Sequence, residues 1–160
     1  MEDTMNLSAK KLIEPTRGAN VFLVDEDLEF LEAVRATIQR SGQTVKACDS
    51  YSNGIRQLES GAFDIIFVGQ GSRNFEGRCV LEYATTLDRK LPIVIVARYL
   101  EMGSYLEAMQ LGAVDYISPG LSESEITRVV QTHSLHRRTR SCTVKPERSA
   151  PATIAVPLVV

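Results

Sequence analysis

The chain has 160 residues, of which 44% are hydrophobic and 24% are charged, and its formal net charge at pH 7 is -2. This length fits one globular domain with short tails, and the weak overall charge gives no sign of nucleic-acid binding. No apolar run comes near the ~20 residues that cross a bilayer, the N-terminus lacks the apolar core of a signal peptide, and the three cysteines have no metal-binding spacing. We therefore expect a cytoplasmic protein with no role at a membrane.

Short apolar runs alternate with amphipathic stretches along residues 19–135. Each apolar run is bounded by acids or turn residues, which is typical of a strand buried on both faces. The predicted strands are 21–24, 44–48, 64–69, 92–97 and 114–117, and the predicted helices are 28–40, 52–60, 76–88, 101–111 and one that a Ser122–Glu125 capping box opens. The pattern predicts an α/β fold: a doubly wound, five-stranded parallel sheet, (βα)5, with helices on both faces in a three-layer sandwich.

The two ends of the chain fall outside this alternation. Residues 1–18 are polar and contain Pro15 and Gly18, which predicts a flexible leader. Residues 136–160 open with a basic cluster and contain three prolines, which predicts a disordered tail. Its apolar end, residues 154–160, is interpreted as a frayed or truncated segment, and a docking peptide is the alternative.

Three segments of the predicted domain combine a strand with characteristic residues and follow one another at regular spacing. Residues 20–27 pair a buried strand with the acids Asp25 and Glu26, residues 63–68 lead an apolar strand to Gly69, and residues 111–116 turn into the fifth strand at Tyr116. In this order and spacing, residues 19–135 resemble a response-regulator receiver domain of two-component (phosphorelay) signalling. The resemblance implies a fold that accepts a phosphoryl group on an aspartate, with a divalent metal beside the acidic pair.

That chemistry needs a nucleophile and cations around the phosphoryl oxygens. The resemblance places the acceptor aspartate at Gly69, the Ser/Thr hydroxyl at Ala97, and the lysine at Ser118 or Pro119. None of these residues supplies the required group, and only the acidic pocket of Asp25 and Glu26 remains, where weak Mg²⁺ binding stays open. The resemblance therefore implies a degenerate receiver, or pseudo-receiver, which is not an enzyme and uses no cofactor.

Two arginines are candidates to fill the vacated site. Arg98 follows the fourth strand directly, and Arg73 lies in the loop after the third. Because both are expected at the carboxyl edge of the sheet beside Asp25 and Glu26, we hypothesise that one guanidinium replaces the metal. A solvent-facing arginine is the alternative.

A second candidate site is the surface around the fourth helix and the fifth strand. In the resembled family this surface responds to phosphorylation and binds partners. The expected interaction face consists of Tyr99, Met102, Tyr105, Met109 and Tyr116. Leu106 and Met109, or their neighbours, are expected inside, and the rest are expected to form an apolar contact patch.

The leading hypothesis is a receiver-like module that acts by phosphorylation-independent protein contact. Its partner would be a histidine kinase, another regulator or a second copy, with a homodimer formed through the fourth helix, fifth strand and fifth helix. Neither nucleic acid nor membrane is an expected partner. Two alternatives stay open: a phosphotransfer-competent regulator with a non-standard acceptor, and a small-molecule-binding module of the flavodoxin-like kind.

Overall fold

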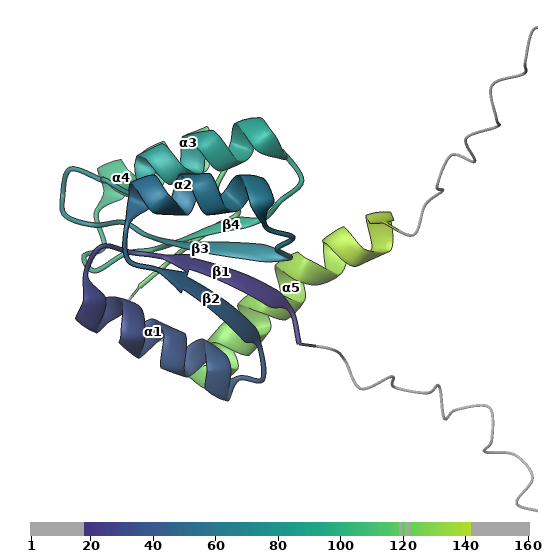
Figure 1. Cartoon of the computed structure of the whole chain (residues 1–160). Coiled ribbons are helices and arrows are strands. Elements are labelled where there is room, and N and C mark those ends of the chain that lie inside the picture. Colours follow the sequence, from purple (N-terminus) through teal and green to yellow (C-terminus); the bar gives the residue numbers. More distant parts are fainter. Residues whose placement is uncertain (1–17, 119, 121, 142–160) are drawn as a thin grey trace, which may run out of the picture.

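The structure is a computed structural model, which describes residues 18–118, 120 and 122–141. Strands and helices alternate through this stretch (Figure 1). In chain order they are β1 (Asn20–Val24), α1 (Leu28–Arg40), β2 (Thr44–Cys48), α2 (Tyr51–Ser60), β3 (Ile65–Gly69), α3 (Arg78–Leu87), β4 (Ile93–Val96), α4 (Met102–Leu111), β5 (Asp115–Ile117) and α5 (Glu123–Ser141). The predicted α/β architecture is confirmed, and all bounds except the end of α5 lie within two residues of the predicted ones.

The five strands form one parallel sheet in the order β2-β1-β3-β4-β5. β3 is the central strand, and all five of its residues are buried, as its unbroken apolar sequence predicts. The chain starts at β1, passes to β2 on one side and then returns to build β3, β4 and β5 on the other. The crevice where the direction reverses, at the carboxyl ends of β1 and β3, is where ligands bind in sheets of this kind.

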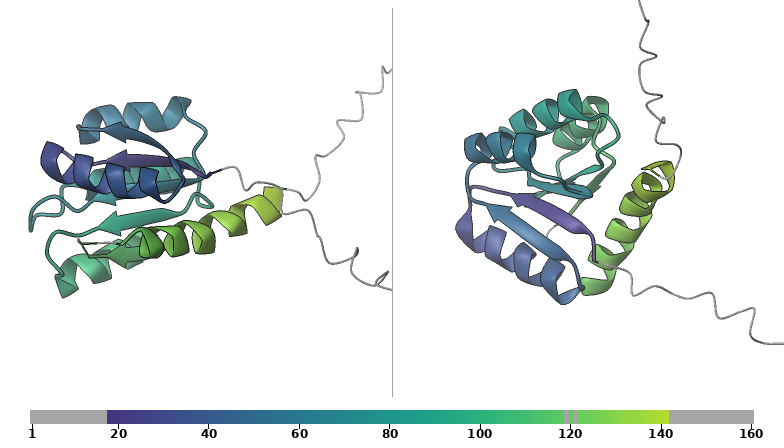
Figure 2. Two further views of the ribbon diagram at one scale, coloured as in Figure 1. Left: turned by 90° about the horizontal axis from the view of Figure 1, so that it is seen from below. Right: turned by 45° about the vertical axis from the view of Figure 1, so that its right-hand side comes forward.

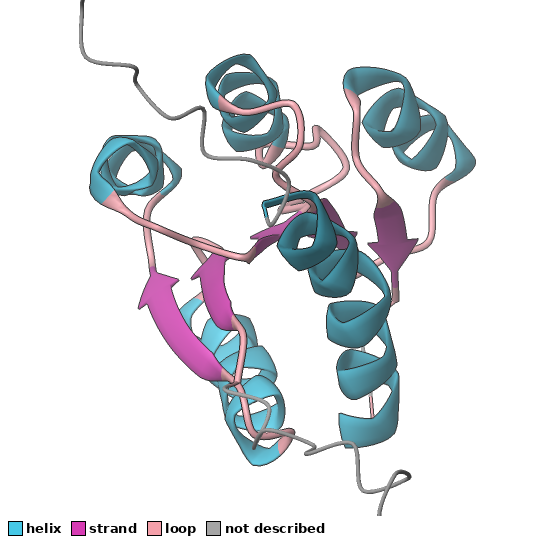
Figure 3. Cartoon of the chain, turned by 90° about the vertical axis from the view of Figure 1, so that its right-hand side faces the viewer, coloured by secondary structure: helices cyan, strands magenta, loops and turns pink. Residues whose placement is uncertain are grey.

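Helices cover both faces of the sheet, as Figures 1 and 3 show. Alternate residues of each strand point to opposite faces. Phe22 and Val24 therefore pack on the side of α2, α3 and α4, whereas Val21 and Leu23 pack on the side of α1 and α5. The two cores on either side of the sheet make the three layers that the sequence predicts.

The last helix begins as predicted and ends later than predicted. Ser122 Oγ accepts a hydrogen bond from the Glu125 amide at 3.3 Å, and the Glu125 carboxylate accepts one from the Ser122 amide at 2.8 Å, which confirms the capping box. The helix then continues past the sheet to Ser141 (Figure 2). Residues 136–141 are therefore helical rather than the start of a disordered tail, because this stretch has neither glycine nor proline and arginine favours helices. The remaining tail, 142–160, and the leader up to residue 17 lie outside the described residues.

No membrane-spanning helix occurs in the described part of the chain, where every helix is too short or too polar to cross a bilayer.

Candidate functional site

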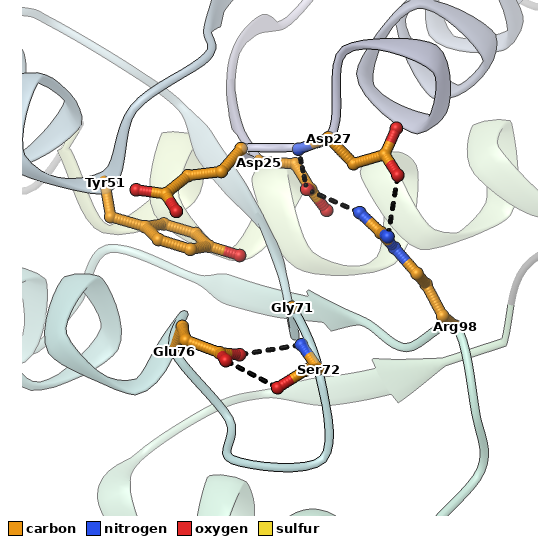
Figure 4. Close-up of a pocket in the computed structure, with 8 residues that line it drawn as sticks. Asp25, Asp27, Tyr51, Gly71, Ser72, Glu76 and Arg98 are labelled. Atoms are coloured by element: carbon orange, nitrogen blue, oxygen red, sulfur yellow. Dashed lines mark hydrogen bonds and ion pairs between the residues drawn. The ribbon is translucent and has the colours of Figure 1, made fainter.

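The carboxyl edge of the sheet brings Asp25 and Gly69 together. Val24 of β1 and Val68 of β3 are partners in register, so the residues that follow them are neighbours. An open pocket of about 360 Å³ lies at this edge (Figure 4). Half of its lining residues are acidic, and the lining consists of Asp25, Glu26, Asp27, Tyr51, Gly71, Ser72, Glu76 and Arg98.

Gly69 has no room for a side chain. A Cβ atom built on Gly69 would lie 1.7 Å from Oδ2 of Asp25, far inside any real contact distance. The Asp25 side chain itself is 1% exposed, so it has little freedom to move aside. The carboxylate of Asp25 thus occupies the space that a residue-69 side chain would need.

The backbone of Gly69 is also engaged. The Tyr51 hydroxyl, at the start of α2, donates a 2.9 Å hydrogen bond to the Gly69 carbonyl, and this bond is buried. Burial raises the pKa of Tyr51, and the nearby carboxylates of Asp25 and Glu26 add to the effect, so the ring stays a neutral donor. Tyr51 was not among the predicted site residues, because an aromatic residue at the start of a helix is typical of the core.

Arg98 forms the centre of the charged network. Its Nη2 donates to Asp25 Oδ1 at 2.9 Å, and its Nη1 donates to Asp27 Oδ2 at 2.8 Å (Figure 4). The guanidinium carbon also lies 4.9 Å from the centroid of the Phe30 ring, within cation–π range. One arginine therefore joins the loop after β4 to the loop after β1 and to the first turn of α1.

Asp27 is the acid of this site that was not predicted from the sequence. The hypothesis paired an arginine with Asp25 and Glu26, whereas Arg98 bridges Asp25 and Asp27. Asp27 caps α1, because its Oδ1 accepts the amide of Phe30 at 3.0 Å. The available signal was the third acid in a row before a predicted helix, which is a typical N-cap position. Within the described residues, the exposed Arg73 forms no ion pair with these acids.

The two acids that Arg98 bridges differ in their electrostatics. Burial raises the pKa of Asp25 above its usual range, and this outweighs the lowering by the Asp27 amide and by Arg98. Among the described residues, no donor forms a hydrogen bond with Asp25 Oδ2. The pKa of Asp27 is lowered instead, first by the Phe30 amide that its carboxylate accepts and then by Arg98. Arg98 therefore holds one buried carboxylate that is costly to ionise and one partly exposed carboxylate that ionises readily.

The other positions implied by the resemblance supply no reactive group. Ala97 is fully buried and Ser118 is partly buried, while Pro119 lies outside the described residues. Ser72, in the loop after β3, donates its hydroxyl and its amide to the carboxylate of Glu76. These hydrogen bonds lower the pKa of Glu76 and close the loop on itself.

The donor set does not fit the divalent metal that the fold family implies. Gly69 contributes no carboxylate, Asp25 Oδ1 is taken by Arg98, and Asp25 Oδ2 is buried against Gly69. Among the described residues no three His, Cys, Asp or Glu side chains are placed to hold a metal ion. A metal ion would have to compete with the guanidinium of Arg98 for the carboxylates of Asp25 and Asp27.

The second candidate surface is more exposed than predicted. Helix α4 buries Ser104 and Ala108 against the sheet, while Leu106 and Met109 are 51% and 38% exposed. Leu106 and Met109, or their neighbours, were expected inside, and it is the neighbouring Ala108 that lies there, while Leu106 and Met109 stay at the surface. The exposed apolar residues around α4 are Tyr99, Leu100, Met102, Tyr105, Leu106 and Met109.

Tyr116 lies at the inner edge of this surface. Its ring is partly buried and meets the ring of Tyr105 edge-on, with centroids 5.6 Å apart. Its hydroxyl donates to Gln70 Oε1 at 2.5 Å and lies 3.3 Å from the carbonyl of Tyr99. Of the five residues predicted for the interaction face, Tyr116 contacts both Tyr99 and Tyr105, and Met102 and Met109 are exposed on α4.

Comparisons with known proteins agree with this architecture. The sequence pattern of the family described as "Response regulator receiver domain" matches residues 21–131. The transcriptional regulatory protein ZraR of Escherichia coli is 22% identical over 129 residues, which cover 78% of this chain and 29% of that protein. The response regulator protein FleR of Pseudomonas aeruginosa is 26% identical over 118 residues, which cover 74% of this chain and 25% of FleR. The chain spans less than a third of the length of these curated relatives.

Solved structures show the same fold. A CheY-like response regulator receiver domain protein from Methanospirillum hungatei superposes with a TM-score of 0.69 at 17% identity, covering 77% of this chain and 98% of that one. A receiver domain protein from Clostridium thermocellum also reaches a TM-score of 0.69, at 14% identity, covering 76% of this chain and 98% of that one. At these identities the likeness concerns the fold alone.

Proposed function

Because this chain belongs to the response regulator receiver domain family, we propose that it serves two-component signalling as a phosphorylation-independent protein-interaction module. It acts by presenting a surface rather than by transferring a phosphoryl group, and it has no enzymatic activity. The proposal concerns this receiver alone, since the curated relatives are far longer than the part it matches.

The contact between Asp25 and Gly69 carries the proposal. An acyl phosphate needs a carboxylate at the end of β3, and this position has neither a side chain nor the space for one. A replacement acceptor would have to stand within reach of the same edge. Asp64 lies five residues upstream of Gly69, roughly 16 Å away at ~3.3 Å per strand residue, so it cannot serve.

The ion pairs of Arg98 support the same proposal. In a phosphorylated receiver, charge in the pocket depends on the metal and on the phosphoryl group. Here the cation is the guanidinium of Arg98, which belongs to the chain itself and pairs with Asp25 and Asp27. The pocket therefore holds one charge arrangement, and no ligand has to arrive to complete it.

The exposed residues around α4 support a protein partner. Apolar side chains at positions 102, 105, 106 and 109 recur at helical spacing on the outer side of α4. A helix that only packs on its own sheet would have its apolar side chains on the inner side instead. Methionines adapt to a partner's shape, and the aromatic rings add contact area. The proposed partner is a histidine kinase, another regulator or a second copy bound through α4, β5 and α5.

A phosphorylation assay tests the first half of the proposal. The protein is incubated with acetyl phosphate and Mg²⁺, and its intact mass is measured beside a phosphorylatable receiver treated in parallel. We expect no mass change in this chain. A gain of one phosphoryl group on an acidic residue would establish the runner-up, a phosphotransfer-competent regulator with a non-standard acceptor.

A matched pair of surface variants tests the second half. Leu106→Asp places a charge within the exposed apolar residues of α4, whereas Leu87→Asp places one on a leucine of similar exposure, 48%, at the end of α3. Sedimentation velocity over a range of concentrations measures self-association, and the same variants are titrated against a purified cognate kinase. We expect Leu106→Asp to weaken association and Leu87→Asp to leave it unchanged. Equal behaviour of the two variants contradicts a contact surface on α4.

A further inference from the structure

Gln70, the residue after Gly69, is buried although it is polar. It is 1% exposed and follows the carboxyl end of β3, the central strand of the sheet. Its amide donates to the Val96 carbonyl of β4 at 2.8 Å, and its carbonyl accepts the amide of Gly77, just before α3, at 3.2 Å. The backbone of this residue is therefore fixed from both sides.

The side chain of Gln70 reaches two further elements. Its Nε2 donates to Ser104 Oγ of α4 at 3.3 Å, and its Oε1 accepts the hydroxyl of Tyr116 of β5 at 2.5 Å. Both side-chain contacts span long separations in sequence, 34 and 46 residues. A buried amide group without hydrogen-bond partners destabilises the folded state, so the loss of either hydrogen bond lowers stability.

We infer that Gln70 is a positioning residue that fixes Tyr116 and α4 in one arrangement, so that the exposed apolar residues of α4 are presented constantly. This inference rests on the proposed function and deepens it, because it names the device that holds the interaction surface. The amide side chain links the end of β3 to that surface through hydrogen bonds that need neither phosphate nor metal.

The surroundings of Tyr116 are consistent with one held ring position. Tyr105 packs edge-on against the ring, and the carbonyl of Tyr99 lies 3.3 Å from its hydroxyl. Partial burial raises the pKa of Tyr116, so the hydroxyl remains a donor at any physiological pH. If Tyr116 rotated outward, it would leave Gln70 Oε1 buried without a partner.

Hydrogen exchange on the full chain tests the inference. Gln70→Leu keeps about the same volume but removes both side-chain hydrogen bonds, and Tyr116→Phe removes only the hydroxyl. We expect amide exchange in α4 and β5 to become at least tenfold faster in both variants, with α1 and β2 unchanged. The double variant should show little more than Gln70→Leu alone, because the two residues share one hydrogen bond.

A second pair of variants controls for nonspecific loosening and for failure to fold. Ser104→Ala removes the α4 partner of Gln70, whereas Ser134→Ala removes a similarly buried serine whose hydroxyl donates to the Val130 carbonyl within α5. Ser104→Ala should speed exchange in α4, and Ser134→Ala should not. Unchanged exchange in α4 and β5 for Gln70→Leu and Tyr116→Phe, or effects of these two that simply add, would overturn the inference.

The outcome is separable from that of the proposed function. If acetyl phosphate phosphorylated the protein while Gln70→Leu still loosened α4, the proposed function would fall and the role of Gln70 would stand. If no phosphorylation occurred and Gln70→Leu left amide exchange unchanged, the proposed function would stand and the role of Gln70 would fall.

Discussion

Removal of Arg98 is the most direct test of how the charged site is held together. Arg98→Ala deletes the hydrogen bonds to Asp25 and Asp27 and the contact with the Phe30 ring. It leaves Asp25 in place, 1% exposed and without its charge partner. The variant should therefore be folded but markedly less stable.

The size of the loss follows from the three contacts. Removing one partner of a buried pair costs about 3–5 kcal/mol, and the low end applies because Arg98 is itself 27% exposed. The pair with the more exposed Asp27 adds little, because solvent screens it, and the contact with Phe30 adds about 0.5–1 kcal/mol. We expect the free energy of unfolding to fall by roughly 3.5–4 kcal/mol and the melting temperature to fall by about 14–16 °C.

Urea unfolding of the wild type and of Arg98→Ala measures this loss, with Arg40→Ala as the matched control. Arg40 pairs with Glu123 between α1 and α5, and both side chains are more than half exposed, so its removal should cost about 0–1 kcal/mol. The penalty of Arg98→Ala should also shrink as the pH falls through the raised pKa of Asp25, because a protonated Asp25 no longer needs the guanidinium. A loss no larger than that of Arg40→Ala would refute the reasoning.

Three further predictions concern the same edge of the sheet. In thermal unfolding, Gly69→Ala should destabilise the folded protein by about 1–3 kcal/mol, because the new Cβ meets the Asp25 carboxylate. The control Gly103→Ala meets no described atom within 4 Å and should be neutral or stabilising by up to ~1 kcal/mol. Tyr51→Phe removes one buried hydrogen bond to the Gly69 carbonyl and should lower the free energy of unfolding by about 0.5–1.5 kcal/mol; an unchanged denaturation midpoint would contradict that bond. Because the folded-state pKa of Asp25 is raised, folding favours the protonated acid, and its contribution to stability is lost as pH rises above the ordinary value of 3.8. Asp25→Asn should therefore gain stability relative to wild type as pH is raised from that value, and a relative loss in pH-dependent unfolding would mean that Arg98 outweighs burial.

The sheet and its helices were predictable because their signals are local. The residues of β3 and β4 form unbroken apolar runs, and glycines or caps mark most helix ends. The end of α5 was not predictable, since its basic residues favour helix and tail alike. Periodicity left open whether Leu106 and Met109 or their neighbours lie inside α4, because a helical period identifies an apolar face without saying which face meets the sheet.

The site was only partly predictable from sequence. The absence of a side chain at Gly69 and the position of Arg98 after β4 followed from the alternation of elements and from the resemblance. The choice of Asp27 over Glu26 depends on how α1 begins, and the role of Gln70 depends on contacts made 34 and 46 residues away. No local pattern reveals such contacts, because they arise only when α4 and β5 are packed against the sheet.

The groups at the carboxyl edge depend on one another. Asp25 can lie over Gly69 only because that residue has no side chain, and a buried carboxylate in that place is held by Arg98. An aspartate at position 69 would therefore meet Asp25 Oδ2 and add a second negative charge to a site whose cation is already shared by two acids. Restoring the acceptor alone would strain the edge without creating a metal site. A return to phosphoryl transfer would require Asp25 to vacate the space and Arg98 to release it, which are changes in at least two elements at once.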